Sequence, residues 1–320
     1  MPPGRKAVWT IAPMALSFLT TQLLAMILSI PFKQTGFQAF EDPNNPINPL
    51  IYVVAIVCFS AVILLIVRLK RAKLITYLIL GATALVLMDV FMIIIAFGLY
   101  YGTGIETYLW ESSMAAGLAL GIALTYALYK NPEWHVVNTV GILMGAGVAS
   151  IMGISFGILP VIIFLIALAI YDAIAVYKTK HMISLADAVT EQHLPVLLVY
   201  PKDEGYSFKK QKGIKKELDS GKEREALFMG LGDIIIPSVL AVSAFSFLAP
   251  VASLGTLGPF LVALGTMLGI MGGFACLMVL VMKGKPQAGL PLLNAGAILG
   301  YLLSYIVVYG NFSFGFALWW

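Results

Sequence analysis

Three aspartates stand inside long apolar runs of this sequence, where ionisable side chains are rare: Asp89, Asp172 and Asp233. A charge at mid-bilayer costs about 2.5–3.5 kcal/mol on insertion scales, so an acid inside a membrane span indicates function. Two carboxylates a few ångströms apart cannot both ionise comfortably, and they share one proton. The ionised carboxylate can take a proton from water while its protonated partner hydrogen-bonds to a peptide carbonyl. Paired in this way, two of these aspartates could hydrolyse a peptide bond.

The composition excludes an ordinary soluble domain. Of the 320 residues 60% are hydrophobic and only 11% are charged, and the mean hydropathy is +0.93. Soluble domains are about 45–50% apolar and about 25% charged, and disordered chains are less apolar still. The net charge of +4 does not indicate a nucleic-acid partner, because the basic residues stand in short blocks between apolar runs, as orientation signals do. The chain is therefore predicted to be an integral, multi-pass membrane protein.

Apolar segments of about 20 residues predict the membrane spans. Two apolar runs are too long for a single span, so the chain must turn back in each. The first, whose only charge is Asp172, turns near Gly153, Gly157 and Pro160, and the second, which is uncharged, turns near Pro250, Gly255 and Pro259. The first apolar run is too long for a signal-peptide core and is predicted to be a retained span. The nine predicted spans cover residues 8–31, 50–68, 74–99, 110–129, 135–153, 158–177, 226–249, 258–282 and 288–309.

The distribution of basic residues predicts the orientation. With the N-terminus in the cytoplasm, 19 of the 20 lysines and arginines fall on the cytoplasmic side, and only Lys33 falls outside. The sequence thus predicts an all-α polytopic membrane protein with nine transmembrane helices, a cytoplasmic N-terminus and an extracytoplasmic C-terminus.

The predicted domains are a six-helix membrane part (1–177), a cytoplasmic loop (178–225) and a three-helix membrane part (226–320). The loop carries ten basic and eight acidic residues, which favours a solvated, partly disordered segment that contacts anionic lipid. Within it, residues 194–200 are β-prone.

Depth in the membrane separates the three acids. Asp172 precedes Lys178 by six residues and Asp233 follows Arg224 by nine, so both lie about 9–13 Å from cytoplasmic charges on consecutive antiparallel spans. These two carboxylates can face one another. Asp89 lies about 24 Å beyond Lys73, in the outer half of the membrane, and is interpreted as a single buried acid bonded to a neighbouring group.

The residues around Asp233 favour a specialised site. Gly230 and Gly232 would let another backbone approach closely, and Pro237 lacks the amide that would bond the Asp233 carbonyl. A small-residue helix contact with an ordinary kink is the alternative interpretation.

The motifs that contain Asp172 and Asp233 resemble those of a known family. Tyr171-Asp172 resembles the YD motif of the presenilin and signal-peptide-peptidase family, and Gly230-Leu231-Gly232-Asp233 resembles its GxGD motif. The nine spans and the large loop fit the same pattern. The PAL motif of the family corresponds to a stretch that keeps only the leucine: Gln287, Ala288, Gly289, Leu290 and Pro291. The chain resembles a microbial, archaeal-type homologue in a cell membrane.

The resemblance implies an intramembrane aspartyl protease that cuts transmembrane helices, with Asp172 and Asp233 as the catalytic pair. A helical substrate must unwind before attack, and its freed backbone then needs new partners. Irregular backbone over Gln287–Pro291 could supply them, and strand addition at residues 194–200 is a further hypothesis. No cofactor is implied; membrane lipid and further copies of the chain are possible partners.

Three other functions remain open from the residues alone. Paired intramembrane acids also serve proton- or cation-coupled transporters and channels. A peptidase of the prepilin type also uses a GxGD aspartate, with a site near the cytoplasmic face. A scaffold without chemistry would use pairs such as Gly117/Gly121 and Gly265/Gly269 only to pack helices.

Metal sites are not predicted. Two cysteines far apart in apolar stretches and three histidines in or near loops have no ligand spacing: Cys58, Cys276, His135, His181 and His193.

Overall fold

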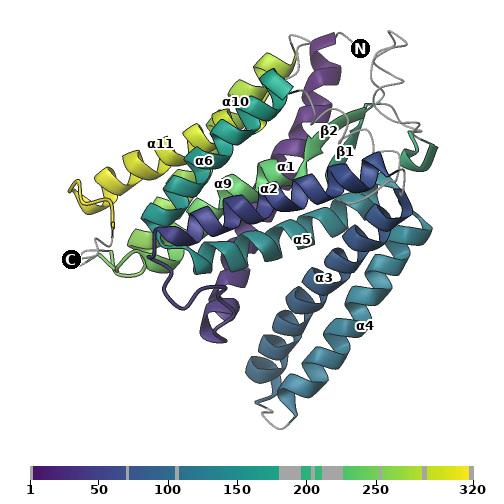
Figure 1. The fold of residues 1–320 in the computed structure, drawn as a ribbon. Helices are drawn as coiled ribbons and strands as arrows, with labels where there is room; N and C mark the ends of the chain where they lie inside the picture. The colour runs from purple at the N-terminus through teal and green to yellow at the C-terminus, as the bar shows by residue number, and fades with distance from the viewer. Residues whose placement is uncertain are drawn as a thin grey trace. The chain divides into compact units, whose positions relative to one another are not determined.

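The computed structural model describes residues 3–69, 72–104, 108–179, 196–202, 206–210, 226–251, 254–282 and 287–316. The part of the chain that it describes is mostly helical (Figure 1). The α-helices are α1 (Pro3–Gln34), α2 (Ile47–Arg68), α3 (Ala72–Thr103), α4 (Leu109–Lys130), α5 (Trp134–Ser155), α6 (Ile158–Ala173), α9 (Leu231–Phe247), α10 (Leu257–Val281) and α11 (Gly289–Tyr309).

Seven of the described helices are long and apolar enough to cross a membrane, and two shorter apolar helices, Ile47–Ile63 and Leu231–Phe247, accompany them. The multi-pass membrane protein predicted from composition is confirmed. The count of nine spans and the orientation of the termini stay predictions. Lys33, in the last turn of α1, donates a hydrogen bond to the carbonyl of Ser246 in the last turn of α9. The ends of α1 and α9 therefore meet.

Both predicted turns within the long apolar runs are confirmed. Helix α5 ends at Ser155 and α6 begins at Ile158, and the Gly157 amide between them donates to the carbonyl of Pro43. A Cβ on Gly157 would lie 2.0 Å from Oδ1 of Asn44, so the Asn44 side chain would have to move before a larger residue could stand there. The second run divides between the end of α9 at Phe247 and the start of α10 at Leu257.

A small sheet corrects the all-α prediction. Strand β1 (Leu197–Pro201) pairs antiparallel with β2 (Ala226–Gly230), with Leu197 opposite Gly230 and Pro201 opposite Ala226. The β-prone stretch at residues 194–200 is thus a strand from Leu197 onward, and Leu194 and Pro195 lie outside the described residues. A one-turn 3₁₀ helix, Phe208–Lys210, is the other described element of the 178–225 loop.

The seventh predicted span, 226–249, is also corrected. Its first five residues form β2, and the helix begins only at Leu231, which leaves 17 helical residues. Hydropathy could not reveal this change, because β2 (Ala-Leu-Phe-Met-Gly) is as apolar as the helix that follows it.

The chain falls into two compact units. One contains Met1–Ser17, Ser60–Gly147 and Met182–Leu231, and the other contains Phe18–Phe59, Val148–His181 and Gly232–Trp320. Helices α1, α2 and α5 each continue from one unit into the other.

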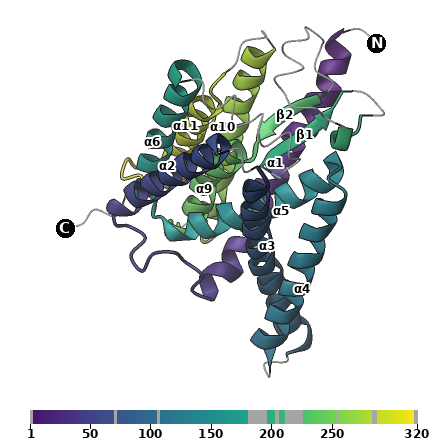
Figure 2. The same ribbon diagram turned by 45° about the vertical axis from the view of Figure 1, so that its right-hand side comes forward.

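In the first unit, α3 and α4 lie side by side in both views (Figures 1 and 2). Glycines on α4 permit the contact: a Cβ on Gly117 would lie 2.7 Å from the Met92 amide nitrogen, and one on Gly121 would lie 2.9 Å from that of Met88. The sheet is held to α5 by Asn138, whose side-chain amide bonds both the N–H and the C=O of Val199 at 2.8 Å. The Asn138 side chain thereby occupies the outer edge of β1.

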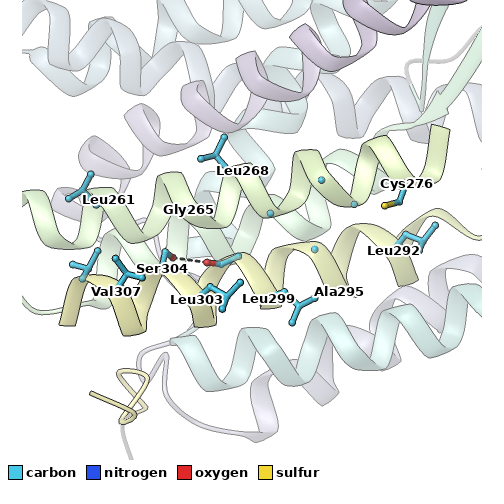
Figure 3. Close-up of a pocket in the computed structure, with 16 residues that line it drawn as sticks. Leu261, Gly265, Leu268, Cys276, Leu292, Ala295, Leu299, Leu303, Ser304 and Val307 are labelled. Atoms are coloured by element: carbon cyan, nitrogen blue, oxygen red, sulfur yellow. Dashed lines mark hydrogen bonds between the residues drawn. The ribbon is translucent and has the colours of Figure 1, made fainter. Parts of the chain in front are cut away.

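In the second unit, α10 and α11 lie close along glycine-rich faces (Figure 3). A Cβ on Gly269 would lie 2.2 Å from the Gly296 carbonyl oxygen, and one on Gly265 would lie 2.3 Å from Cβ of Ser304. The predicted packing role of both glycine pairs, Gly117/Gly121 and Gly265/Gly269, is confirmed. An open apolar groove of about 900 Å³ runs along these two helices.

Replacing Gly269 by alanine is expected to lower the thermal unfolding midpoint in detergent. The new methyl group would meet backbone atoms of α11, so the helices must separate, at a cost of about 1–3 kcal/mol. Gly272→Ala is the matched control: no described atom lies within 4 Å of its Cβ position, and alanine favours a helix interior by about 1 kcal/mol over glycine. Equal midpoints for the two variants would contradict this account of the α10–α11 contact.

Candidate active site

Asp172 lies near the end of α6 and is buried, with 5% of its surface exposed. Its Oδ2 accepts a hydrogen bond of 3.1 Å from the amide of Leu290, and the Gly289 amide also donates to this carboxylate. Both amides belong to the first turn of α11, where N–H groups have no partner within the helix. The contact thus fixes the Asp172 carboxylate against the start of α11.

Asp233 lies in the first turn of α9 and is partly exposed. Its position follows from the change of structure at Gly230 and Leu231, where β2 ends and the helix begins. The Asp233 carboxyl carbon and both of its oxygens lie 3.1 Å from the place where a Cβ on Gly289 would stand. Asp233 therefore lies against the same end of α11 as Asp172.

The two carboxylates converge on adjacent residues of one helix, Gly289 and Leu290. Asp172, Asp233 and α11 all belong to the second unit. A pair of acids in this arrangement can share a proton and act together on one bound group. The sequence-based expectation that these carboxylates face one another stays a prediction.

The remaining residues of the two motifs differ in their exposure. Leu231 is buried, whereas Tyr171 is half-buried and Gly232 is exposed. A Cβ on Gly232 would make one ordinary contact with the described residues, at 3.8 Å from the Ile236 side chain. Close helix packing among the described residues therefore does not require a glycine at this position. Gly232 leaves open space beside the backbone next to Asp233.

The prediction of irregular backbone over Gln287–Pro291 is wrong for most of the stretch. Gly289, Leu290 and Pro291 form the first turn of α11, and only Gln287 and Ala288 precede the helix. Proline suits this first turn because the N–H that it lacks has no partner within a helix. The amides of Gly289 and Leu290 donate to Asp172, so they are not vacant partners for another backbone.

Sequence reasoning missed Tyr177. Its hydroxyl donates a hydrogen bond of 3.0 Å to Oε1 of Gln287 and accepts one of 3.3 Å from the amide of Ala288. Tyr177 lies five positions after Asp172, and on a regular α-helix the two side chains would point about 140° apart. The signal was hidden because α6 continues as a π-helical turn over Ile174–Thr179.

The third intramembrane acid, Asp89, lies half-buried on α3 in the first unit. Within the described residues, groups of three or more His, Cys, Asp or Glu side chains that could hold a metal do not occur. His135 is described, whereas His181 and His193 lie outside the described residues. The apolar groove along α10 and α11 is not lined by Asp172 or Asp233.

Comparisons with known proteins identify a family and two similar solved structures. The chain matches the family described as signal-peptide peptidase, presenilin aspartyl protease, over residues 14–309. Two solved structures of a presenilin family intramembrane aspartate protease, in the C222 and P2 space groups, are similar to it. The C222 structure is 33% identical in sequence with a TM-score of 0.65, and the match covers 92% of this chain and 98% of the solved chain. The P2 structure is 34% identical with a TM-score of 0.63, and the match covers 92% of this chain and 97% of the solved chain. A search of curated proteins found no match.

The chain belongs to the signal-peptide peptidase and presenilin aspartyl protease family. The predicted enzyme class, an aspartic endopeptidase that cuts within membranes, is the class of this family and of both solved structures. These findings give no support to the transporter alternative.

Proposed function

We propose that this protein hydrolyses peptide bonds of transmembrane helices by water attack at the Asp172–Asp233 pair. The observation that carries the proposal is the convergence of both carboxylates on Gly289 and Leu290 at the start of α11. Membership of the protease family supports the reaction class, and the apolar helices support a substrate that lies in the membrane.

The reaction needs one proton shared between the two acids. The ionised carboxylate takes a proton from water as the water oxygen attacks the peptide carbonyl carbon. The protonated carboxyl gives its proton to the carbonyl oxygen, and a tetrahedral diol forms. The protonated carboxyl then gives its proton to the leaving nitrogen as the C–N bond breaks, and the ionised carboxylate takes a proton from a diol hydroxyl. The products are a carboxylic acid and an amine, and the pair again shares one proton. The amides that hold Asp172 keep its oxygens aimed at the reacting group, which favours such a reaction by orientation.

The substrate backbone needs hydrogen-bond partners once its helix unwinds. The open space at Gly232 would let an extended backbone pass beside Asp233. The strand-addition hypothesis is retained with a different edge. Asn138 bonds both polar backbone groups of Val199, so β1 is engaged on its outer side. Phe228 of β2 lies opposite Val199 of β1. Because the Val199 backbone groups point away from β2, the Phe228 N–H and C=O point away from β1. These are the groups that an added strand would bond.

Replacing Phe228 by proline is therefore expected to raise KM for a transmembrane substrate about tenfold, because one hydrogen bond to the added strand is lost. Phe228→Val is the matched control, since it loses the same ring but keeps the outward N–H. The ladder between β1 and β2 does not use this N–H, so both variants are expected to fold. Identical KM values for the two variants would exclude strand addition at β2.

The proposed function is tested with purified protein in lipid vesicles that contain a single-span peptide, and the products are identified by mass. A hydroxyl-bearing mimic of the tetrahedral diol is expected to inhibit, because it resembles the transition state. A transporter would instead produce an ion flux that depends on both aspartates and would leave the peptide intact. Cuts confined to the cytoplasmic margin of the peptide would favour the prepilin type of peptidase.

A further inference from the structure

The start of α11 has no cap of its own. Ala288 is the residue before the helix, and no side-chain hydrogen bond caps the helix from that position. The first amides of a helix need partners from elsewhere when they are buried, and Ala288 is only 2% exposed. Two side chains of α6 and its π-helical turn supply these partners: Asp172 accepts from Gly289 and Leu290, and Tyr177 accepts from Ala288.

The Tyr177 hydroxyl bridges two groups with one consistent orientation. Its oxygen accepts the Ala288 N–H, and its proton is then free to bond Oε1 of Gln287. A phenol can donate once and accept at the same time, so both bonds can form together. Tyr177 is 57% exposed, so its side chain does little for the core, and its hydrogen bonds to Gln287 and Ala288 are made by the hydroxyl.

The π-helical turn explains why Asp172 and Tyr177 reach the same target. In an α-helix these two positions would point about 140° apart. Hydrogen bonds from residue i to i+5 widen the turn, so the residue five positions on returns towards the same face. The turn over Ile174–Thr179 thus lets one helix hold α11 at consecutive amides.

We propose that Tyr177 is a positioning residue, which holds Gln287 and Ala288 so that the Gly289 and Leu290 amides keep Asp172 oriented for catalysis. This inference rests on the proposed function. Tyr177 is not placed in contact with the reacting atoms; it acts through the start of α11. Without its hydroxyl, Asp172 would be the remaining side chain among the described residues that accepts hydrogen bonds from the start of α11, and the orientation of its carboxylate would be less restricted.

The test uses Tyr177→Phe, which keeps the ring and removes the hydroxyl. Hydrogen exchange at the amides of residues 288–290 is expected to accelerate about tenfold, since one buried amide loses its partner. In the cleavage assay, kcat is expected to fall about tenfold while KM stays within about twofold, because orientation is lost and substrate binding is not. Tyr126→Phe, an exposed tyrosine on α4, is the matched control and is expected to change neither quantity.

Gln287→Met removes only one of the two Tyr177 contacts, so its effect is expected to be smaller than that of Tyr177→Phe. The double variant is expected to match Tyr177→Phe, because both changes act on one network. Unchanged exchange and kcat in Tyr177→Phe, or strictly additive losses in the double variant, would overturn the proposal. Faster exchange with unchanged kcat would overturn the catalytic part of it.

Exchange is read without substrate, which separates this inference from the function on which it rests. If the unmodified protein cuts nothing and Tyr177→Phe still exchanges faster, the contact at α11 is supported and the proposed function fails. A lower thermal midpoint that accompanies a kcat loss without faster local exchange would point to general destabilisation and overturn the positioning role.

Discussion

Asp172→Asn and Asp233→Asn are each expected to lower cleavage by at least about 10³-fold, because each removes one of the two carboxyl groups between which the proton is shared. Asparagine has nearly the same shape as aspartate, but it can neither ionise nor pass on a proton. At position 172 its side-chain oxygen can still accept the Leu290 amide, so the start of α11 is expected to stay in place. The loss should therefore appear in kcat, with a thermal midpoint close to that of the unmodified protein.

Asp89→Asn is the matched control for both variants. It makes the same change at an intramembrane acid on α3, outside the unit that holds the candidate pair. Its turnover is expected to stay within about twofold of the unmodified protein, because no reacting group is lost. Near-normal turnover in either Asp172→Asn or Asp233→Asn would refute the shared-proton mechanism, whatever Asp89→Asn does.

Gly289→Val is expected to abolish detectable cleavage by displacing the Asp233 side chain. The Cβ alone would lie 3.1 Å from the carboxyl carbon and both oxygens of Asp233, which is tighter than ordinary contact. The two further methyl groups of valine need additional space beside this already tight contact. Since a shift of about 1 Å in catalytic geometry costs about 10²-fold in rate, the loss should reach at least that size. The carboxyl group ends a side chain that can rotate, so folding should survive.

Gly289→Ala completes the series, because it adds the Cβ and nothing more. Alanine is the residue of the family's PAL motif at this position, and it demands a displacement of only a few tenths of an ångström. Activity is thus expected to fall in the order glycine, alanine, valine, with kcat as the measurement. Gly272→Val places the same side chain where the described residues leave open space, and it should keep full activity. Cleavage by Gly289→Val at more than about a tenth of the normal rate would contradict the contact between Gly289 and Asp233.

The sequence alone was sufficient for the properties that depend on short stretches of chain. Hydropathy over about 20 residues predicted apolar helices such as α5 and α6, because a membrane-spanning helix needs about that length. Glycine and proline located the turns between them. The cost of burying a carboxylate singled out Asp172 and Asp233, and the spacing of each acid from flanking charges placed both at a similar depth. The family followed from the motifs on those spans and is confirmed.

Other features were decided only by contacts between distant segments. Strand β2 forms where an apolar run could equally continue as helix, because pairing with β1 about thirty residues earlier supplies its hydrogen bonds. The edge of β1 is engaged because Asn138, on α5, folds against Val199. These partners are far apart in the chain, so no local pattern contains them.

The same physical reason governs the candidate site. The sequence identifies two acids, but Leu290 meets Asp172 across 118 positions of the chain, and Gly289 meets Asp233 across 56. Tyr177 reaches Ala288 only because the end of α6 widens into a π-helical turn. Hydropathy and charge act along the chain, and they predicted most of its apolar helices. Packing and hydrogen bonding act across it, and only the tertiary structure decided how the start of α11 holds the two acids.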